Sequence, residues 1–359
     1  MDAFRFKTEL QVPTTPVKNQ AQTRTCWSFA SISLLEAEIL RRQGRAVNLS
    51  EMYMVRLTYP RKARRYVRMH GHMAFHASGL AGDALHVLRE FGLVPEQSYD
   101  GKSPHEVEHD HREMDAVLKA ALDAVIQNHS GKLSKAWPKV VEVILDAYLG
   151  PPPEQFIYQE QTYTPKRFAE SLDLRADDYV ELTSYTHQPF YTWFSLDIPD
   201  NWSLNRFFNL PLEEFMEVLE HALEQGYSFV WDGDITEPTF STKHGVAVLP
   251  SKAWDAYSVE ERDRFWEQPV HELTVTQALR QEAFDNYTST DDHLMHIIGR
   301  ARDRYGTTYY VSKNSWGLKG TPYGGLIYLS DAYVRAKTIS IMVNKNALPK
   351  SLQEKLGRG

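Results

Sequence analysis

Cysteine is the scarcest chemically reactive residue in this 359-residue chain, which contains only Cys26. A single cysteine excludes an intramolecular disulfide and a cysteine-rich metal site. It serves either as a small buried apolar side chain or as a reactive thiol. The residues around it must decide between these two roles.

Long apolar segments and an excess of basic residues are also missing. No apolar run approaches the roughly 18 residues of a membrane helix, and no leader-like apolar stretch opens the chain. The 40 Lys and Arg against 47 Asp and Glu give a net charge of −7, without the basic excess typical of nucleic-acid binding. We therefore expect no membrane and no nucleic-acid partner. A cytoplasmic location is expected, with export after removal of a signal segment as the alternative.

The first half of the chain has a helical pattern. From Cys26 to Gly44, apolar residues recur at helical spacing, which predicts a half-buried helix with Gly44 as its C-cap. A short second helix should follow Ser50, a favourable N-cap. Residues 61–72 are rich in arginine and histidine and are interpreted as a solvated face. Residues 101–177 form a helical insertion whose apolar stripe is expected to comprise Val117, Leu118, Ala121 and Val125.

The second half has a different pattern. Short runs rich in Val, Ile, Thr and aromatic residues, separated by Gly, Pro and Asp, predict strands between about 178 and 343. One helix should interrupt them, over residues 212–225. The fold class is therefore α+β. The predicted division is a helical lobe (1–100), the insertion (101–177), a β-rich lobe (178–343) and a tail (344–359).

The position of Cys26 favours a reactive thiol. A nucleophilic thiol needs help with ionisation, a base, and a donor for the oxyanion that develops. Cys26 stands at a helix N-terminus, where the dipole favours a thiolate. His293 precedes an apolar strand and Asn314 ends the next, so neighbouring strands can bring them together. Gln20 is close enough in sequence to reach over Cys26.

These motifs resemble those of a known family. Gln20 stands six residues before the Cys-Trp-Ser-Phe-Ala run that starts at Cys26, followed by Asp-His-Leu-Met at 292–295 and Lys-Asn-Ser-Trp-Gly at 313–317. Their order and form resemble the papain-like cysteine peptidases, in particular the bleomycin hydrolase or aminopeptidase C branch. The resemblance implies a two-lobed fold with a helical left lobe and a β-barrel-like right lobe. It also implies hydrolysis of peptide substrates without a cofactor.

The resemblance also implies a role for each site residue. Cys26 would be the nucleophile, His293 the general base and acid, and Asn314 the residue that orients the imidazole. Gln20 and the backbone amide of Cys26 would form the oxyanion hole, and Trp316 would shield the histidine–asparagine hydrogen bond from water.

The implied substrate-binding residues depart partly from the family pattern. Ser78 and Gly79 stand where the family has a Gly-Gly pair that binds the substrate backbone, and Arg24 replaces a glycine. We expect Arg24 to favour acidic substrates. The tail, which is too polar to add to a core, would enter the cleft, where the carboxylate of Gly359 would pair with the α-ammonium group of a substrate.

An aminopeptidase is accordingly the expected function. An endopeptidase with an open cleft and an inactive peptide-binding relative remain alternatives. The resembled branch commonly forms closed hexamers, which leaves a homo-oligomer open. No metal is expected, because no HExxH motif occurs. The histidine groups at 70, 72 and 76 and at 105, 109 and 111 are interpreted as exposed.

Overall fold

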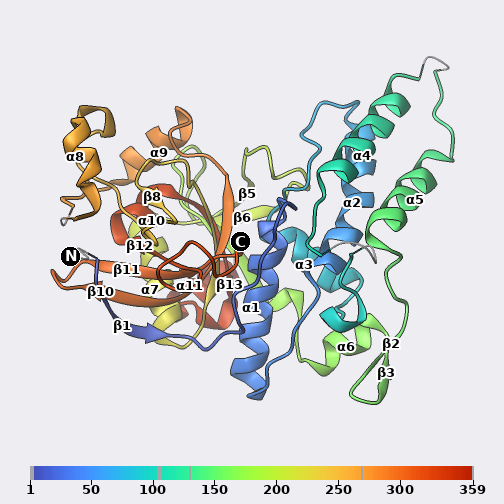
Figure 1. Cartoon of the computed structure of the whole chain (residues 1–359), viewed down its shortest axis with the longest axis horizontal. Helices are drawn as coiled ribbons and strands as arrows, with labels where there is room; N and C mark the ends of the chain where they lie inside the picture. Colours follow the sequence, from blue (N-terminus) through green and yellow to red (C-terminus); the bar gives the residue numbers. More distant parts are fainter. Residues whose placement is uncertain (1–3, 103–106, 129–130, 268–269, 358–359) are drawn as a thin grey trace. The chain divides into compact units, whose positions relative to one another are not determined.

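The structure is a computed structural model, and it describes residues 4–102, 107–128, 131–267 and 270–357 (Figure 1). The chain divides into two compact units. Unit 1 comprises residues 1–19, 178–194 and 206–359, and unit 2 comprises residues 20–177 and 195–205. The α+β fold class is confirmed. The division differs from the predicted one because residues 1–19 join the β-rich unit and residues 195–205 join the helical unit.

Unit 2 is built on helices. They are α1 (Cys26–Gln43), α2 (Glu51–Arg68), α3 (Ala81–Glu90), α4 (Arg112–Ile126), α5 (Trp137–Leu149) and α6 (Pro165–Ser171), with a hairpin of β2 (Phe156–Tyr158) and β3 (Gln161–Tyr163). The predicted C-cap is confirmed, since Gly44 has a φ of 66° and its N–H donates to Leu40 O. However, α1 is buried on all sides from Cys26 to Ile39 and not on one face alone.

The second helix is longer than its sequence suggests. The hydroxyl of Ser50 accepts from Tyr53 N–H, as expected of an N-cap. The helix then continues for 18 residues through Pro60 and includes part of the basic segment that was interpreted as a solvated face. Within that segment Lys62 is only 2% exposed. The prediction of a short helix was wrong because tertiary packing retains a helix that proline alone would disfavour.

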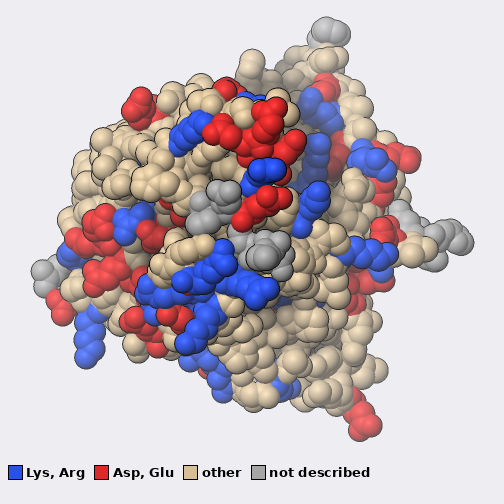
Figure 2. All heavy atoms as spheres, turned by 60° about the vertical axis from the view of Figure 1, so that its left-hand side comes forward, with Lys and Arg blue, Asp and Glu red and all other residues tan. Residues whose placement is uncertain are grey.

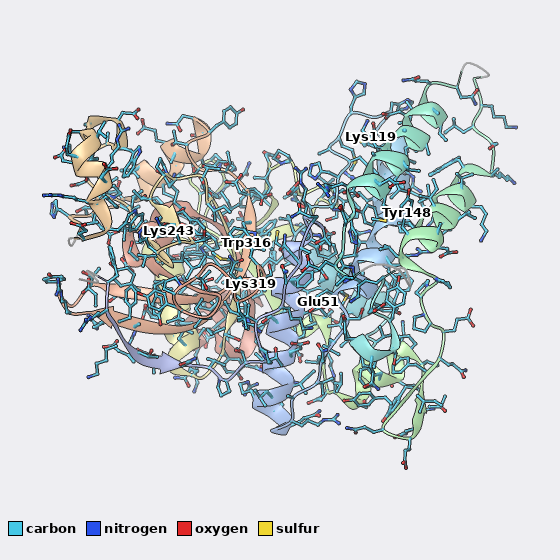
Figure 3. All side chains as sticks on the ribbon, in the orientation of Figure 1. Glu51, Lys119, Tyr148, Lys243, Trp316 and Lys319 are labelled. Carbon is cyan, nitrogen blue, oxygen red and sulfur yellow. The ribbon has the colours of Figure 1, made fainter. Side chains whose placement is uncertain are left out.

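The helical insertion packs onto α2 through polar contacts with a buried arginine. Arg56, 3% exposed, places Nη2 2.8 Å from Glu142 Oε2 and 2.5 Å from Asp146 Oδ1, both on α5. Figure 3 labels Lys119 of α4 and Tyr148 of α5, which hydrogen-bonds Glu113 of α4. The insertion is therefore part of unit 2.

The apolar stripe predicted for the insertion was largely wrong. The residues of α4 that are buried are Met114, Leu118 and Leu122, and Val117 is 38% exposed. Spacing of four residues places Met114, Leu118 and Leu122 on one face, so the prediction had the right helix and the wrong side.

Unit 1 is built on one large sheet. Its strands are β1 (Phe6–Gln11), β4 (Tyr179–Thr183), β5 (Trp193–Ser195), β6 (Arg206–Asn209), β7 (Phe229–Gly233), β8 (Phe240–Ser241), β9 (Val246–Ala247), β10 (His293–Asp303), β11 (Thr308–Lys313), β12 (Leu326–Ser330) and β13 (Thr338–Asn344). The order is β5-β6-β4-β13-β7-β10-β11-β12-β9-β8, and β1 also pairs with β10. That pairing explains why residues 1–19 leave the helical lobe.

The helices of unit 1 cover and connect this sheet. They are α7 (Leu212–Glu224), α8 (Val259–Asp263), α9 (Gln277–Asp285), α10 (Asp331–Lys337) and α11 (Lys350–Leu356). The core forms where α7 packs on the sheet, and it includes Phe215 and Leu219 of α7 together with Trp231 and Tyr310 of the strands. Across the described ranges, no helix has both the length and the apolar content needed to span a membrane. Acidic and basic side chains are interspersed over the face in Figure 2.

Candidate active site

Cys26 is the first residue of α1. Its side chain is buried, with 6% exposure. Thr25 is the N-cap without a side-chain capping bond, and the first turn contains no acidic residue. The positive end of the helix dipole is therefore not offset by a local carboxylate, which favours a negative charge on the thiol sulfur.

The loop from Gln20 to Thr25 is braced by the insertion. Gln22 N–H donates to His109 O at 3.1 Å, and His111 N–H donates to Gln22 O at 3.2 Å. Gln20 is buried at 7% exposure. Arg24 is exposed and has a φ of 56°, a left-handed conformation that glycine adopts more readily. The backbone at position 24 thus has the form expected where a relative has glycine.

The histidines beside this loop correct one expectation. His111 was interpreted as exposed but is 3% exposed, and both of its ring nitrogens are without a hydrogen-bond partner among the described residues. Burial lowers the pKa of His111 to about 3, so the ring is neutral. His105 lies outside the described residues. No group of three or more potential metal ligands forms within the described part of the chain.

Trp27 joins the start of α1 to residues 77–79. Its indole Nε1 donates to Ala77 O at 2.9 Å. A Cβ on Gly79 would lie 2.9 Å from Asp83 Oδ2 and 3.3 Å from the ring of Trp27. Gly79 is therefore needed for a close backbone approach, and its peptide lies beside the residue that follows Cys26.

Ser78 is surrounded by polar groups. Its hydroxyl contacts the ring Nδ1 of His76 and donates to Asp200 Oδ1 at 3.0 Å. The buried Lys62 donates from Nζ to the carbonyls of His76, at 2.7 Å, and Ser78. No sequence pattern marks Lys62, His76 or Asp200 as members of a site. Asp200 is 122 residues from Ser78, and no local pattern signals such a contact.

His293 and Asn314 are hydrogen-bonded in unit 1. His293 begins β10 and Asn314 follows β11, an adjacent antiparallel strand, and His293 Nε2 lies 2.8 Å from Asn314 Oδ1. The N–H of Ser315 also donates to Oδ1, which fixes the orientation of the amide. An amide oxygen only accepts, so Nε2 carries the hydrogen and Nδ1 is the basic nitrogen of the neutral ring.

Trp316 covers the imidazole. Its ring stacks on that of His293 with centroids 4.6 Å apart and an angle of 25° between planes (Trp316 is labelled in Figure 3). His293 is 3% exposed and Asn314 4%. Burial lowers the pKa of His293 to about 4, and the hydrogen bond to Asn314 opposes this. The neutral imidazole is therefore available as a base at neutral pH.

The C-terminal segment packs on unit 1, contrary to expectation. Leu352 of α11 is 3% exposed within the core, and Leu356 packs against the same cluster. Lys355 Nζ pairs with Glu214 Oε2 at 2.8 Å. The segment through Leu356 therefore adds to the core, although it was predicted to be too polar for this. Gly359 lies outside the described residues.

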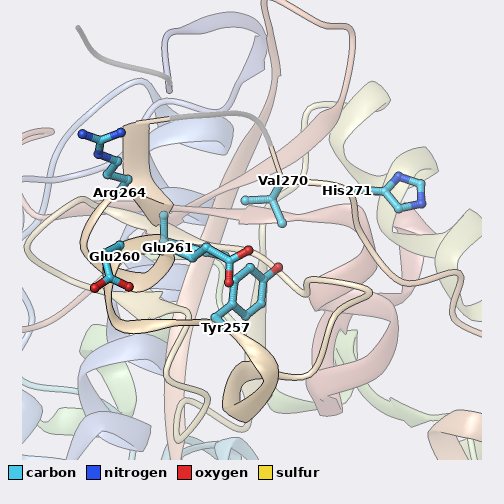
Figure 4. A pocket seen from close by; sticks show the side chains of 7 residues that line it. Tyr257, Glu260, Glu261, Arg264, Val270 and His271 are labelled. Carbon is cyan, nitrogen blue, oxygen red and sulfur yellow. The ribbon is translucent and has the colours of Figure 1, made fainter.

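A separate cavity in unit 1 contains none of the predicted site residues. Its volume is about 380 Å³. Figure 4 shows it lined by Tyr257, Glu260, Glu261, Arg264, Val270 and His271. The carboxylate of Glu261 forms an ion pair with Lys252 and accepts a hydrogen bond from Ser258 N–H, so it already has partners within the protein.

The family follows from the match between residues 63–358 and the model of the Peptidase C1-like family. The chain belongs to this family. It is 24% identical to Aminopeptidase G of Lactobacillus delbrueckii subsp. lactis over 390 aligned residues, which cover 98% of this chain and 85% of the relative. It is 33% identical to human Cathepsin L2 over 85 residues, or 24% of this chain and 23% of the relative.

The structural comparison agrees with the family assignment. The crystal structure of PepW from Lactobacillus rhamnosis HN001 superposes with a TM-score of 0.75 at 19% identity, covering 98% of this chain and 85% of that one. The resemblance to papain-like cysteine peptidases is thereby confirmed, as is the peptidase class of the chain.

Proposed function

We propose that this protein is a thiol-dependent aminopeptidase that uses Cys26, His293 and Asn314. The observation that carries the proposal is the buried His293–Asn314 hydrogen bond under Trp316, in a family member whose only cysteine begins a helix. Similarity to Aminopeptidase G over nearly the whole chain supports removal of N-terminal residues.

The proposed reaction follows from the state of each group. His293 takes the thiol proton of Cys26 at Nδ1, and the thiolate attacks the carbonyl carbon of the scissile peptide. Gln20 and the Cys26 amide stabilise the oxyanion. His293 then protonates the leaving amine and afterwards deprotonates the water that releases the acyl group. Asn314 holds the ring with Nε2 protonated throughout.

Replacement of the nucleophile provides the test. Cys26→Ala should abolish hydrolysis of fluorogenic aminoacyl substrates while circular dichroism and melting temperature stay near those of the wild type. Wild-type protein should also react with an electrophilic thiol reagent faster than free cysteine. Retained turnover in the variant would overturn the proposed mechanism, and labelling no faster than free cysteine would favour a peptide-binding protein without activity.

The ratio of exopeptidase to endopeptidase activity tests the substrate class. An aminopeptidase should cleave peptides with a free α-amino group and discriminate against the same peptides after N-acetylation. Equal cleavage of both would favour an endopeptidase with an open cleft. A truncation after Gly357 keeps Leu352 and Lys355 in place, whereas one at Leu348 would remove core residues and confuse the result. The predicted role of Gly359 is therefore best tested by the truncation after Gly357.

A further inference from the structure

Unit 2 presents a carboxylate beside the predicted substrate-binding residues. Asp200 lies in the segment 195–205, which the chain reaches only after β5. Ser78 Oγ donates to Asp200 Oδ1 at 3.0 Å, and His76 Nε2 lies 3.6 Å from the same oxygen. Both of these short polar contacts involve Oδ1, and no other hydrogen bond of Asp200 occurs within the described ranges, so Oδ2 is left to accept from a bound group. The side chain is 15% exposed, which permits access from solvent.

Lys62 attracts Asp200 electrostatically, but within the described ranges its ammonium group makes its hydrogen bonds to backbone carbonyls and not to this carboxylate. Burial lowers the pKa of His76, Asp200 opposes this effect, and Lys62 and Arg24 reinforce it. The imidazole is therefore mostly neutral at neutral pH. Lys62 directs its ammonium group to two backbone carbonyls, those of His76 and Ser78. A partly desolvated carboxylate with one free oxygen is well suited to bind an ammonium group.

Two buried residues fix the position of this carboxylate. Asn201, 4% exposed, donates from Nδ2 to Leu196 O at 3.0 Å and to Asn205 O at 3.1 Å. Trp202, also 4% exposed, lies under the Arg61 guanidinium, which is 5.0 Å from the ring centroid. The segment is thus cross-linked internally and anchored on α2, so Asp200 is preorganised for binding.

The contacts of Trp27 connect this group to the reaction. Trp27 follows Cys26 in sequence, and its ring packs beside Gly79, the neighbour of Ser78. A peptide that pairs with Ser78 and Gly79 would bring its non-primed end toward Asp200. We propose that Asp200, in place of the Gly359 carboxylate that the resemblance implied, binds the α-ammonium group of the peptide substrate and so determines how many residues are released from its N-terminus. This inference rests on the proposed function and adds a specificity-determining residue to it.

Asp200→Asn is the decisive variant, because it removes the charge and keeps an oxygen for Ser78. Asp197→Asn is the matched control, since Asp197 is exposed in the same segment and makes no contact with Ser78. The substrates are peptide series with a free or an acetylated N-terminus and with the cleaved bond after the first, second or third residue. A further acetylated series carries lysine, which tests whether Asp200 binds a side-chain ammonium group instead.

The proposal requires a selective loss. In Asp200→Asn, kcat/KM should fall roughly tenfold to a hundredfold for free-amine substrates of one preferred length, the range expected for a charged hydrogen bond. Acetylated substrates should change by less than about twofold, and Asp197→Asn should resemble the wild type. Asp200→Glu retains the charge and should restore part of the preference if the asparagine variant folds poorly.

Three results would overturn the assignment. Equal losses on free and acetylated substrates would indicate a structural role for Asp200, and a loss confined to acetylated lysine substrates would indicate side-chain recognition. An unchanged preference in both Asp200 variants would also reject it. None of these outcomes touches the proposed function, which fails separately if wild-type protein cleaves no peptide or if Cys26→Ala remains active.

Discussion

Removing the Asn314 side chain tests the most sharply defined part of the site. Asn314→Ala deletes the oxygen that accepts from both His293 Nε2–H and Ser315 N–H, at 2.8 Å each. Since His293 is 3% exposed, its orphaned N–H gains little compensation from water. Each orphaned buried donor costs about 1–3 kcal/mol, so the free energy of unfolding should fall by about 2–6 kcal/mol before relaxation.

The kinetic effect should be smaller than that of losing the nucleophile. Without Asn314 the ring can place its hydrogen on Nδ1, the wrong nitrogen for accepting the thiol proton. Trp316 still stacks on the imidazole and retains part of its orientation. We therefore expect kcat to fall roughly tenfold to a hundredfold, or about 1.4–2.7 kcal/mol of transition-state stabilisation, with little change in KM.

The assay combines kinetics with a direct view of the tautomer. Steady-state rates on aminoacyl substrates give kcat and KM, and ¹⁵N NMR of the histidine ring reports which nitrogen carries the hydrogen. Asn286→Ala, an exposed asparagine of the same unit, controls for loss of an amide in general. If Asn314→Ala keeps kcat within twofold of the wild type and its ring hydrogen stays on Nε2, the orienting role of Asn314 is wrong.

Three further variants test the remaining parts of the argument. Arg24→Gly should leave stability unchanged or raise it slightly, because φ is 56° there, and should reduce the preference for acidic over neutral peptides about two- to fivefold in kcat/KM. Burial raises the pKa of Glu272 to about 7, so the folded state binds its proton more tightly than the unfolded chain, and this group lowers stability as pH rises from about 4.5 to 7. Glu272→Gln should remove that slope. In urea titrations, the free energy of unfolding of the variant relative to the wild type should rise by on the order of 2 kcal/mol between pH 5 and pH 8, and a difference that stays constant with pH would contradict this. Leu352→Ala should cost about 2–3 kcal/mol in the same titration, since this leucine is 3% exposed, whereas an unchanged midpoint would show that α11 does not support the core.

The sequence predicted those parts of the fold that depend on local patterns. The strands that carry the histidine and the asparagine, the helix that begins at Cys26 and its Gly44 cap all lie where periodicity and turn residues place them. Failures occurred where packing overrides local preference. Helix α2 continues through Pro60, and β1 pairs with a strand almost 300 residues away. The helix propensity of proline does not predict the first feature, and the spacing of apolar residues does not predict the second.

The candidate site divides in the same way. The hydrogen bond between His293 and Asn314 was foreseeable, because two strands joined by a short turn must lie side by side, which brings the start of β10 near the end of β11. The contact between Ser78 and Asp200 was not, because it requires the chain to leave the β-rich unit for residues 195–205 and then return. Within that segment, the burial of Asn201 and Trp202 depends on tertiary contacts. Asn201 donates to a backbone carbonyl, and Trp202 packs against the guanidinium group of Arg61 on α2. A local pattern can therefore identify the groups that perform the chemistry, whereas the residue that selects the substrate emerges only from the tertiary fold. If Asp200→Asn alters substrate preference as proposed, specificity in this chain resides in a segment that could vary without disturbing His293 or Asn314.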